Sequence, residues 1–138
     1  MDQTLTQGDM VLMEKFSKVK RFDVVVFQQP DGTIYIKRVI GLPGDEVRYE
    51  DDQLFINGKK VTESFLSNNR RSDHQVSPYT TDFQLTELIG KKQLPKNEYF
   101  VLGDNRRVSK DSRSFGTVQN KDILGKAQFV YYPLTHIK

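Results

Sequence analysis

Short runs of β-branched and aromatic residues, each followed by turn residues, constrain the fold of this chain more than any other feature. Residues 10–16, 23–29 and 34–40 form three such runs, and the segments EYFVLGD and KAQFVYYP continue the pattern toward the end of the chain. Runs of this length with these residue types are typical of β-strands. The sequence therefore predicts a mostly β fold with a core of antiparallel strands.

The turns in the middle of the chain indicate hairpins. Asp51–Asp52 and Asn57–Gly58 divide residues 46–61 into short apolar runs. Asn57–Gly58 suits a type I′ turn, because both residues tolerate the positive φ that each central position requires. We therefore expect consecutive hairpins in this segment.

The chain becomes less regular after these hairpins. Residues 67–82 are polar and lack a period, so we expect a mobile loop there. Residues 83–90 are expected to form a short helix ended by Gly90, or another strand. We predict two units from this organisation: a core of residues 1–45 and 97–138, and a smaller β-rich subdomain, residues 46–96, inserted into it.

The composition excludes several kinds of site. The 138 residues include no cysteine, so disulfides and thiolate metal sites cannot form. The two histidines, His74 and His136, are far apart in sequence and indicate no metal-ligand cluster. A net charge of +3 is too small to require a nucleic-acid partner, and no apolar run is long enough to span a bilayer. A membrane anchor would lie outside this chain.

Lys37 interrupts an apolar strand in the segment YIKRVIGLPGD, residues 35–45. By the two-residue alternation of a strand, it shares a face with Tyr35 and Val39. One interpretation is an edge-strand lysine whose amine reaches water. The other is an amine held among apolar side chains, where burial lowers its pKa from about 10.4 and allows it to act as a general base. This segment alone favours the first interpretation.

A polar loop, GDNRRVSKDSRSFG at residues 103–116, follows the apolar strand end YFVL. We expect Asp111 and Arg113 to form a charge-assisted pair that fixes this loop. Loops at strand ends are where a rigid scaffold presents reactive groups. This segment alone is also compatible with a surface loop whose polar groups hydrogen-bond one another and take no part in chemistry. The side chains that can hydrogen-bond within the loop are Asp104, Asn105, Ser109, Asp111, Ser112 and Arg113.

Taken together and in order, these segments resemble the extracytoplasmic part of a type I signal peptidase of the Gram-positive kind. The matching segments are TLTQGDMVLMEKF, RFDVVVF, YIKRVIGLPGD, LFINGK, LPKNEYFVLGDNRRVSKDSRSFG and GKAQFVYYP. The resemblance covers nearly the whole chain and is weakest at residues 62–93. The resemblance implies an antiparallel β core of the signal peptidase type with a small inserted β-rich subdomain.

The resemblance also implies a function and a place in the cell. It implies a serine endopeptidase that removes signal peptides from exported preproteins. The protein would act at the extracytoplasmic face of the cell membrane, anchored by an amino-terminal transmembrane helix that this chain does not include. The implied partners are signal peptides and the membrane surface, and the resemblance implies no metal and no organic cofactor.

Particular residues acquire roles from the resemblance. Lys37 matches the general base of a serine–lysine dyad, and Ser109 matches the serine whose hydroxyl orients the lysine amine. The residues that match supporting positions of the loop are Asp104, Asn105, Asp111 and Arg113. The positions that line a shallow pocket for the small residue before the scissile bond are matched by Met1, Leu5, Tyr35 and Ile36.

The nucleophile of the dyad is not matched by any residue of the printed chain. The family's box reads Ser-Met-x-Pro-Thr-Leu, whereas the chain begins MDQTL, so Met1 matches the residue after the serine and Gln3 replaces the proline. We therefore expect the nucleophilic serine immediately before Met1 in the parent protein. We also expect the 138-residue chain by itself to be inactive, and measurable turnover would contradict this alignment.

Two other functions are compatible with the sequence. A parent with another residue before Met1 would be a non-catalytic signal-peptidase-like protein that binds peptides or pilins in surface assembly. Retention of Lys37 and Ser109 favours an active parent, because a binding protein does not need a desolvated lysine. The arginine pairs at 70–71 and 106–107 suggest a nucleic-acid-binding β domain, but such domains use a basic sheet with exposed aromatic residues, which this sequence lacks. We predict no nucleic-acid partner.

Overall fold

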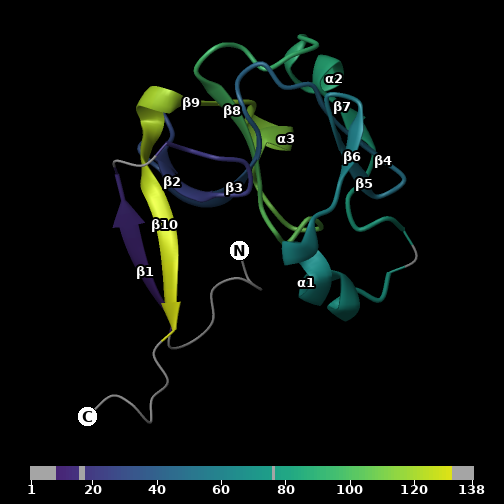
Figure 1. The fold of residues 1–138 in the computed structure, drawn as a ribbon, viewed down its shortest axis with the longest axis horizontal. Coiled ribbons are helices and arrows are strands. Elements are labelled where there is room, and N and C mark those ends of the chain that lie inside the picture. Colours follow the sequence, from purple (N-terminus) through teal and green to yellow (C-terminus); the bar gives the residue numbers. More distant parts are fainter. Residues whose placement is uncertain (1–8, 16–17, 76, 132–138) are drawn as a thin grey trace.

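The computed structural model describes residues 9–15, 18–75 and 77–131, and their strands form two sheets (Figure 1). The first sheet is six-stranded, in the order β1-β10-β2-β3-β8-β9, and the second is four-stranded, in the order β6-β5-β4-β7. The strand pairs of both sheets are antiparallel. The prediction of a mostly β fold with an antiparallel core is confirmed.

The second sheet is formed by a segment that lies between the two halves of the first. The strands of the first sheet are β1 (Asp9–Glu14), β2 (Val24–Gln28), β3 (Ile34–Gly41), β8 (Glu98–Leu102), β9 (Val118–Gln119) and β10 (Ile123–Tyr131). Those of the second are β4 (Val47–Glu50), β5 (Gln53–Ile56), β6 (Lys59–Val61) and β7 (Phe83–Gln84). The helices are α1 (Ser67–Ser72), α2 (Leu85–Ile89) and α3 (Ser112–Phe115), with 3₁₀ turns η1 (Ser64–Leu66) and η2 (Asn120–Asp122).

Strands β3 and β8 lie between two apolar clusters, because successive residues of a strand point to opposite faces. On one face, Val39 and Val101 pack with residues of β2. On the other face, Ile40 and Leu102 belong to a cluster that includes residues of the second sheet. Burial on both faces explains why the segment before Gly103 is apolar without alternation. The two sheets therefore share one core.

Two residues allow the sheets to approach each other at the end of β3. A Cβ atom at Gly41 would lie 2.6 Å from Leu94 Cδ1 and 2.7 Å from Val47 Cγ2, so only glycine fits without a shift. Asp45, in the LPGD turn, accepts hydrogen bonds from Arg21 Nη2 at 2.6 Å, from the Leu42 N–H at 2.8 Å and from Asn57 Nδ2 at 3.1 Å. A turn to which the sequence assigned no chemistry thus connects the two sheets.

The segment expected to be a mobile loop is partly helical, so that prediction is wrong for α1. Leu66, just before α1, is fully buried, and Arg70 within it lies 3.0 Å from Asp52 of the β4–β5 turn. These tertiary contacts hold a segment that has no helical period of its own. Residues 83–90 contain both predicted alternatives, since the strand β7 leads directly into α2, which ends at Gly90 with φ +71°. In the described part of the chain, no helix has the length and apolarity needed to cross a bilayer.

Candidate active site

Lys37 lies on β3, which pairs with β2 on one side and β8 on the other. The interpretation of an edge-strand lysine is therefore wrong. The side chain is half-buried, and its Nζ lies 5.9 Å from the centre of the Tyr35 ring on the same face. On this strand, its amine lies near the loops that join the neighbouring strands.

The group that it reaches is Ser109, whose Oγ lies 3.1 Å from Lys37 Nζ although the two residues are 72 positions apart. The register of the sheet explains the contact. Arg38 pairs with Leu102, the last residue of β8, so Lys37 lies beside Gly103, the first residue of the loop. The loop then turns back and brings Ser109 over the end of β8.

Gly103 leaves the space in which Lys37 and Ser109 meet. A Cβ atom at this position would lie 2.0 Å from Ser109 Oγ and 3.4 Å from Lys37 Nζ. The first distance is far below a van der Waals contact, so a side chain here would displace the serine. The absence of a side chain at Gly103 is therefore a condition for the contact between the two polar groups.

Asp111 fixes the loop from inside, with the Arg113 pair expected from the sequence. Its Oδ2 accepts a hydrogen bond from the Gly103 N–H at 3.0 Å, and Arg113 approaches both oxygens, at 2.9 Å and 2.8 Å. Its Oδ1 also caps α3 by accepting from the Arg113 N–H. Burial by itself would raise the pKa of Asp111, but the hydrogen bonds and charge of Arg113 outweigh burial and hold that pKa below its usual range.

The remaining loop residues have structural partners as well. Arg38 donates to both oxygens of the fully buried Asp104, at 3.0 Å and 2.8 Å, and to the Phe22 carbonyl at 3.0 Å. This bidentate pair was not expected from the sequence, although an arginine next to the candidate lysine on a core strand is a signal for it. Asn105 Oδ1 accepts from the Val108 N–H at 3.3 Å.

Arg106, which the sequence presents only as half of a basic pair, is fully buried. Its side chain is 0% exposed and lies 2.7 Å from Glu63, which follows β6. Its neighbour Arg107 is held by Asp73, with contacts of 2.7 Å to each carboxylate oxygen. The sequence shows no signal for either partner, because both come from the irregular segment between the hairpins and β7.

Of the four residues expected to line a substrate pocket, the structure describes two, Tyr35 and Ile36. Met1 and Leu5 lie outside the described residues. Tyr35 and Ile36 are consecutive and half-buried on a regular stretch of β3, so their side chains point to opposite faces of the sheet. The Tyr35 ring packs against Phe27 and Phe115, with centroid distances of 5.8 Å and 5.6 Å.

Metal ligands are not gathered in this region. Among the described residues, no group of three or more His, Asp or Glu side chains is placed to hold a metal ion. The chemistry that the arrangement supports is proton transfer, because the Lys37 amine lies on a central strand and donates to the Ser109 hydroxyl.

Comparison with known proteins identifies the family of the chain. Residues 1–132 match the family described as signal peptidase, peptidase S26. The chain belongs to this family.

Several signal peptidases are similar along most of the chain. Signal peptidase I V of Bacillus subtilis is 46% identical over 129 residues, which cover 91% of this chain and 76% of the relative. Signal peptidase IB of Staphylococcus aureus is 41% identical, covering 100% of this chain and 76% of the relative. The crystal structure of a signal peptidase I from Enterococcus faecalis V583 superposes with a TM-score of 0.76 at 42% identity, covering 80% of this chain and 97% of that one.

Proposed function

We propose that this protein is a serine endopeptidase that removes signal peptides from exported proteins at the extracytoplasmic face of the cell membrane. Membership of the signal peptidase family supports this function. The observation that carries the proposal is the 3.1 Å contact between Lys37 Nζ and Ser109 Oγ, beside a glycine that leaves room for both groups. A general base needs a fixed position and an oriented lone pair, and these three residues can supply both.

In the proposed reaction, the nucleophile is the serine expected immediately before Met1. Neutral Lys37 accepts the serine proton while the serine oxygen attacks the scissile carbonyl, and the backbone N–H of the nucleophile stabilises the oxyanion. The C–N bond breaks as Lys37 gives the proton to the leaving amine. A water molecule then attacks the acyl-serine ester and loses a proton to Lys37, which passes it to the serine oxygen as the ester bond breaks.

The loop residues would act on Ser109 rather than on the substrate. Asp111 and Arg113 hold the loop closed, and Asp104 is held by Arg38, so the Ser109 hydroxyl has a fixed place from which to orient the lysine amine. The small side chain before the scissile bond would lie in a shallow pocket formed by Met1, Leu5 and the Tyr35–Ile36 stretch of β3. One of these two side chains and their shared backbone can face it. We propose that small residues are preferred at the −1 and −3 positions of the substrate.

The dyad is tested by cleavage of a signal-peptide substrate by the protein as its gene encodes it. We expect Lys37→Ala to reduce cleavage by at least about 10²–10⁴-fold, the contribution typical of a general base. Ser109→Ala should reduce it by only about tenfold, because one orienting hydrogen bond is lost. Lys110→Ala is the matched control: this lysine is exposed in the same loop, and we expect wild-type cleavage.

Two outcomes would contradict the proposal. Unchanged cleavage by Lys37→Ala would exclude this lysine as the base. A wild-type protein that binds signal peptides or pilins without cleaving them would instead establish the non-catalytic function. Circular dichroism of each variant checks that a loss of cleavage is not a loss of fold.

A further inference from the structure

A closed ring of hydrogen bonds joins the second sheet to the loop of the candidate site. Arg106 Nη2 lies 2.7 Å from Glu63 Oε2, and Arg106 Nη1 donates to the Tyr49 hydroxyl at 2.6 Å. The Tyr49 hydroxyl donates in turn to Glu63 Oε2. The exposed fractions of the Arg106 and Glu63 side chains are 0% and 2%, so water does not compete for these bonds.

The surroundings in this ring keep Arg106 charged and Tyr49 protonated. Burial alone would lower the pKa of Arg106, but Tyr49 and Glu63 raise it above its ordinary value, so the guanidinium stays charged. Burial raises the pKa of Tyr49 well above its ordinary value, and its hydroxyl therefore remains a donor at neutral pH. Because desolvation offsets the attraction within a buried ion pair, such a pair gives little stability over apolar packing.

The ring ends at the residue that makes room for the dyad. Arg106 Nε donates to the Gly103 carbonyl at 2.7 Å, while the Gly103 N–H donates to Asp111 at 3.0 Å. Hydrogen bonds thus hold both the N–H and the carbonyl group of Gly103. A Cβ atom on it would lie 2.0 Å from Ser109 Oγ, so even a small shift of its backbone alters the space that this serine occupies.

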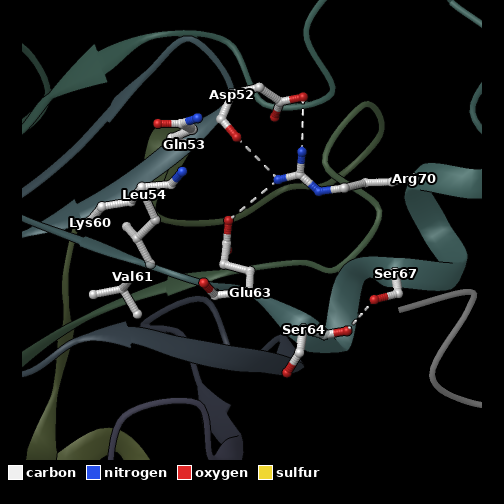
Figure 2. A pocket seen from close by; sticks show the side chains of 10 residues that line it. Asp52, Gln53, Leu54, Lys60, Val61, Glu63, Ser64, Ser67 and Arg70 are labelled. Carbon is white, nitrogen blue, oxygen red and sulfur yellow. Dashed lines mark hydrogen bonds and ion pairs between the residues drawn. The ribbon is translucent and has the colours of Figure 1, made fainter.

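On its outer side, Glu63 lines a pocket of about 350 Å³ in the second sheet (Figure 2). Figure 2 shows Arg70 between Asp52 and Glu63, with its nitrogens 3.0 Å from Asp52 Oδ2 and 3.7 Å from Glu63 Oε1. Glu63 Oε1 has no hydrogen-bond partner among the described residues. The hydrogen bonds of the carboxylate therefore run through Oε2, toward the loop.

We propose that Glu63 is a positioning residue for the reaction, because it fixes Arg106 and thereby the carbonyl group of Gly103. The inference rests on the proposed function and extends the active-site scaffold to the second sheet. Ser109 and Lys37 keep their mutual geometry only while the backbone at Gly103 stays in place. The ring thus gives the second sheet a part in catalysis that acts through Arg106 and Gly103.

The test compares isosteric substitutions of two carboxylates, Glu63 and Asp73, which pair with the neighbouring loop residues Arg106 and Arg107. Glu63→Gln weakens the hold on Arg106, which touches Gly103, whereas Asp73→Asn weakens the hold on Arg107, whose hydrogen bonds go to Asp73 and Ser77. With the protein as its gene encodes it, well below its melting temperature, we expect Glu63→Gln to lower kcat by up to about tenfold, the loss expected for Ser109→Ala, and to leave KM unchanged. Asp73→Asn should keep wild-type kcat.

Wild-type kcat in Glu63→Gln, or an equal loss in Asp73→Asn, would overturn the proposal. If Glu63→Gln does not fold, Tyr49→Phe takes its place, since it removes one hydroxyl from the ring and keeps both charges. We expect Tyr49→Phe to lower kcat severalfold at unchanged KM, and wild-type kcat in this variant would likewise overturn the proposal.

Hydrogen exchange separates this inference from the proposed function, because it needs no cleavage. We expect the Gly103 and Arg106 amides to exchange faster in the folded Glu63 or Tyr49 variant than in the wild type, and at the wild-type rate in Asp73→Asn. Unchanged exchange in the ring variant contradicts the positioning role even if the protein is active. Faster exchange supports it even if the wild type proves to be inactive.

Discussion

The alpha carbon of Gly103 lies beside Ser109 Oγ, and its missing side chain is what lets Lys37 approach. Its φ is outside the left-handed region, so the backbone itself would accept alanine. The effect of a side chain here is therefore steric and local. A single methyl group decides whether a hydroxyl and an amine from distant parts of the chain can meet.

We expect Gly103→Ala to lower kcat for signal-peptide cleavage by about tenfold, as Ser109→Ala does, because a Cβ atom displaces Ser109 from Lys37. Gly41→Ala is the control. Its added methyl group crowds Leu94 and Val47 at the end of β3, away from the dyad. We therefore expect a free energy of unfolding lower by about 1–3 kcal/mol and little change in kcat. Equal kcat in the two variants would show that crowding at Gly103 is harmless.

At the scale of elements, the loop between β8 and β9 depends on the cap of α3. Asp111 is the N-cap residue of this four-residue helix and also holds Gly103. Too short to be stable alone, the helix depends on this buried carboxylate and its arginine partner. The loop should therefore respond to the ionisation of Asp111.

This dependence predicts the direction of a pH effect. The pKa of Asp111 is below its ordinary value of 3.8 in the folded protein, so the carboxylate stabilises the fold above that value, and this contribution is lost as pH falls through the folded pKa. We expect the difference in unfolding free energy between wild type and Asp111→Asn to be largest near neutral pH. Denaturant titrations from about pH 7 to about pH 3 measure it. A difference that stays constant over this range would contradict the assignment.

Elements also differ in how far they could be predicted. Asp51, Asp52, Asn57 and Gly58 all have positive φ, as the turn residues of the hairpins require. The strands followed from their β-branched runs. The helix α1 did not, because its sequence has no apolar period. It is held by two ion pairs to other parts of the chain: its Arg70 with Asp52, and its C-cap residue Asp73 with Arg107.

At the scale of the whole molecule, the two sheets behave as one unit in their packing. They share the cluster around Ile40 and Leu102, and Asp45 joins the first sheet to the Asn57 turn of the second. A shared core makes partial unfolding of one sheet expose apolar surface of the other. The predicted insert and core are therefore expected to unfold together.

We expect a single cooperative unfolding transition that Asp45→Ala shifts by about 1–3 kcal/mol, since it leaves the Leu42 N–H and the Asn57 amide without their partner. Glu50→Ala is the control, because its pair with Arg48 is exposed and should contribute little. Circular dichroism and tyrosine fluorescence should give coincident curves. Two separate transitions would show that the sheets are independent.

Local sequence patterns predicted most of the strands and the hairpin turns, motif order indicated the family, and both together singled out Lys37 and Ser109 as candidates. These follow from local preferences of single residues and from motif order. Tertiary structure alone decided that Lys37 lies on a central strand, that Gly103 makes room for its contact with Ser109, and that Glu63 holds Arg106. The reason is that contacts between residues far apart in sequence depend on sheet register and on packing between sheets, which no local pattern encodes.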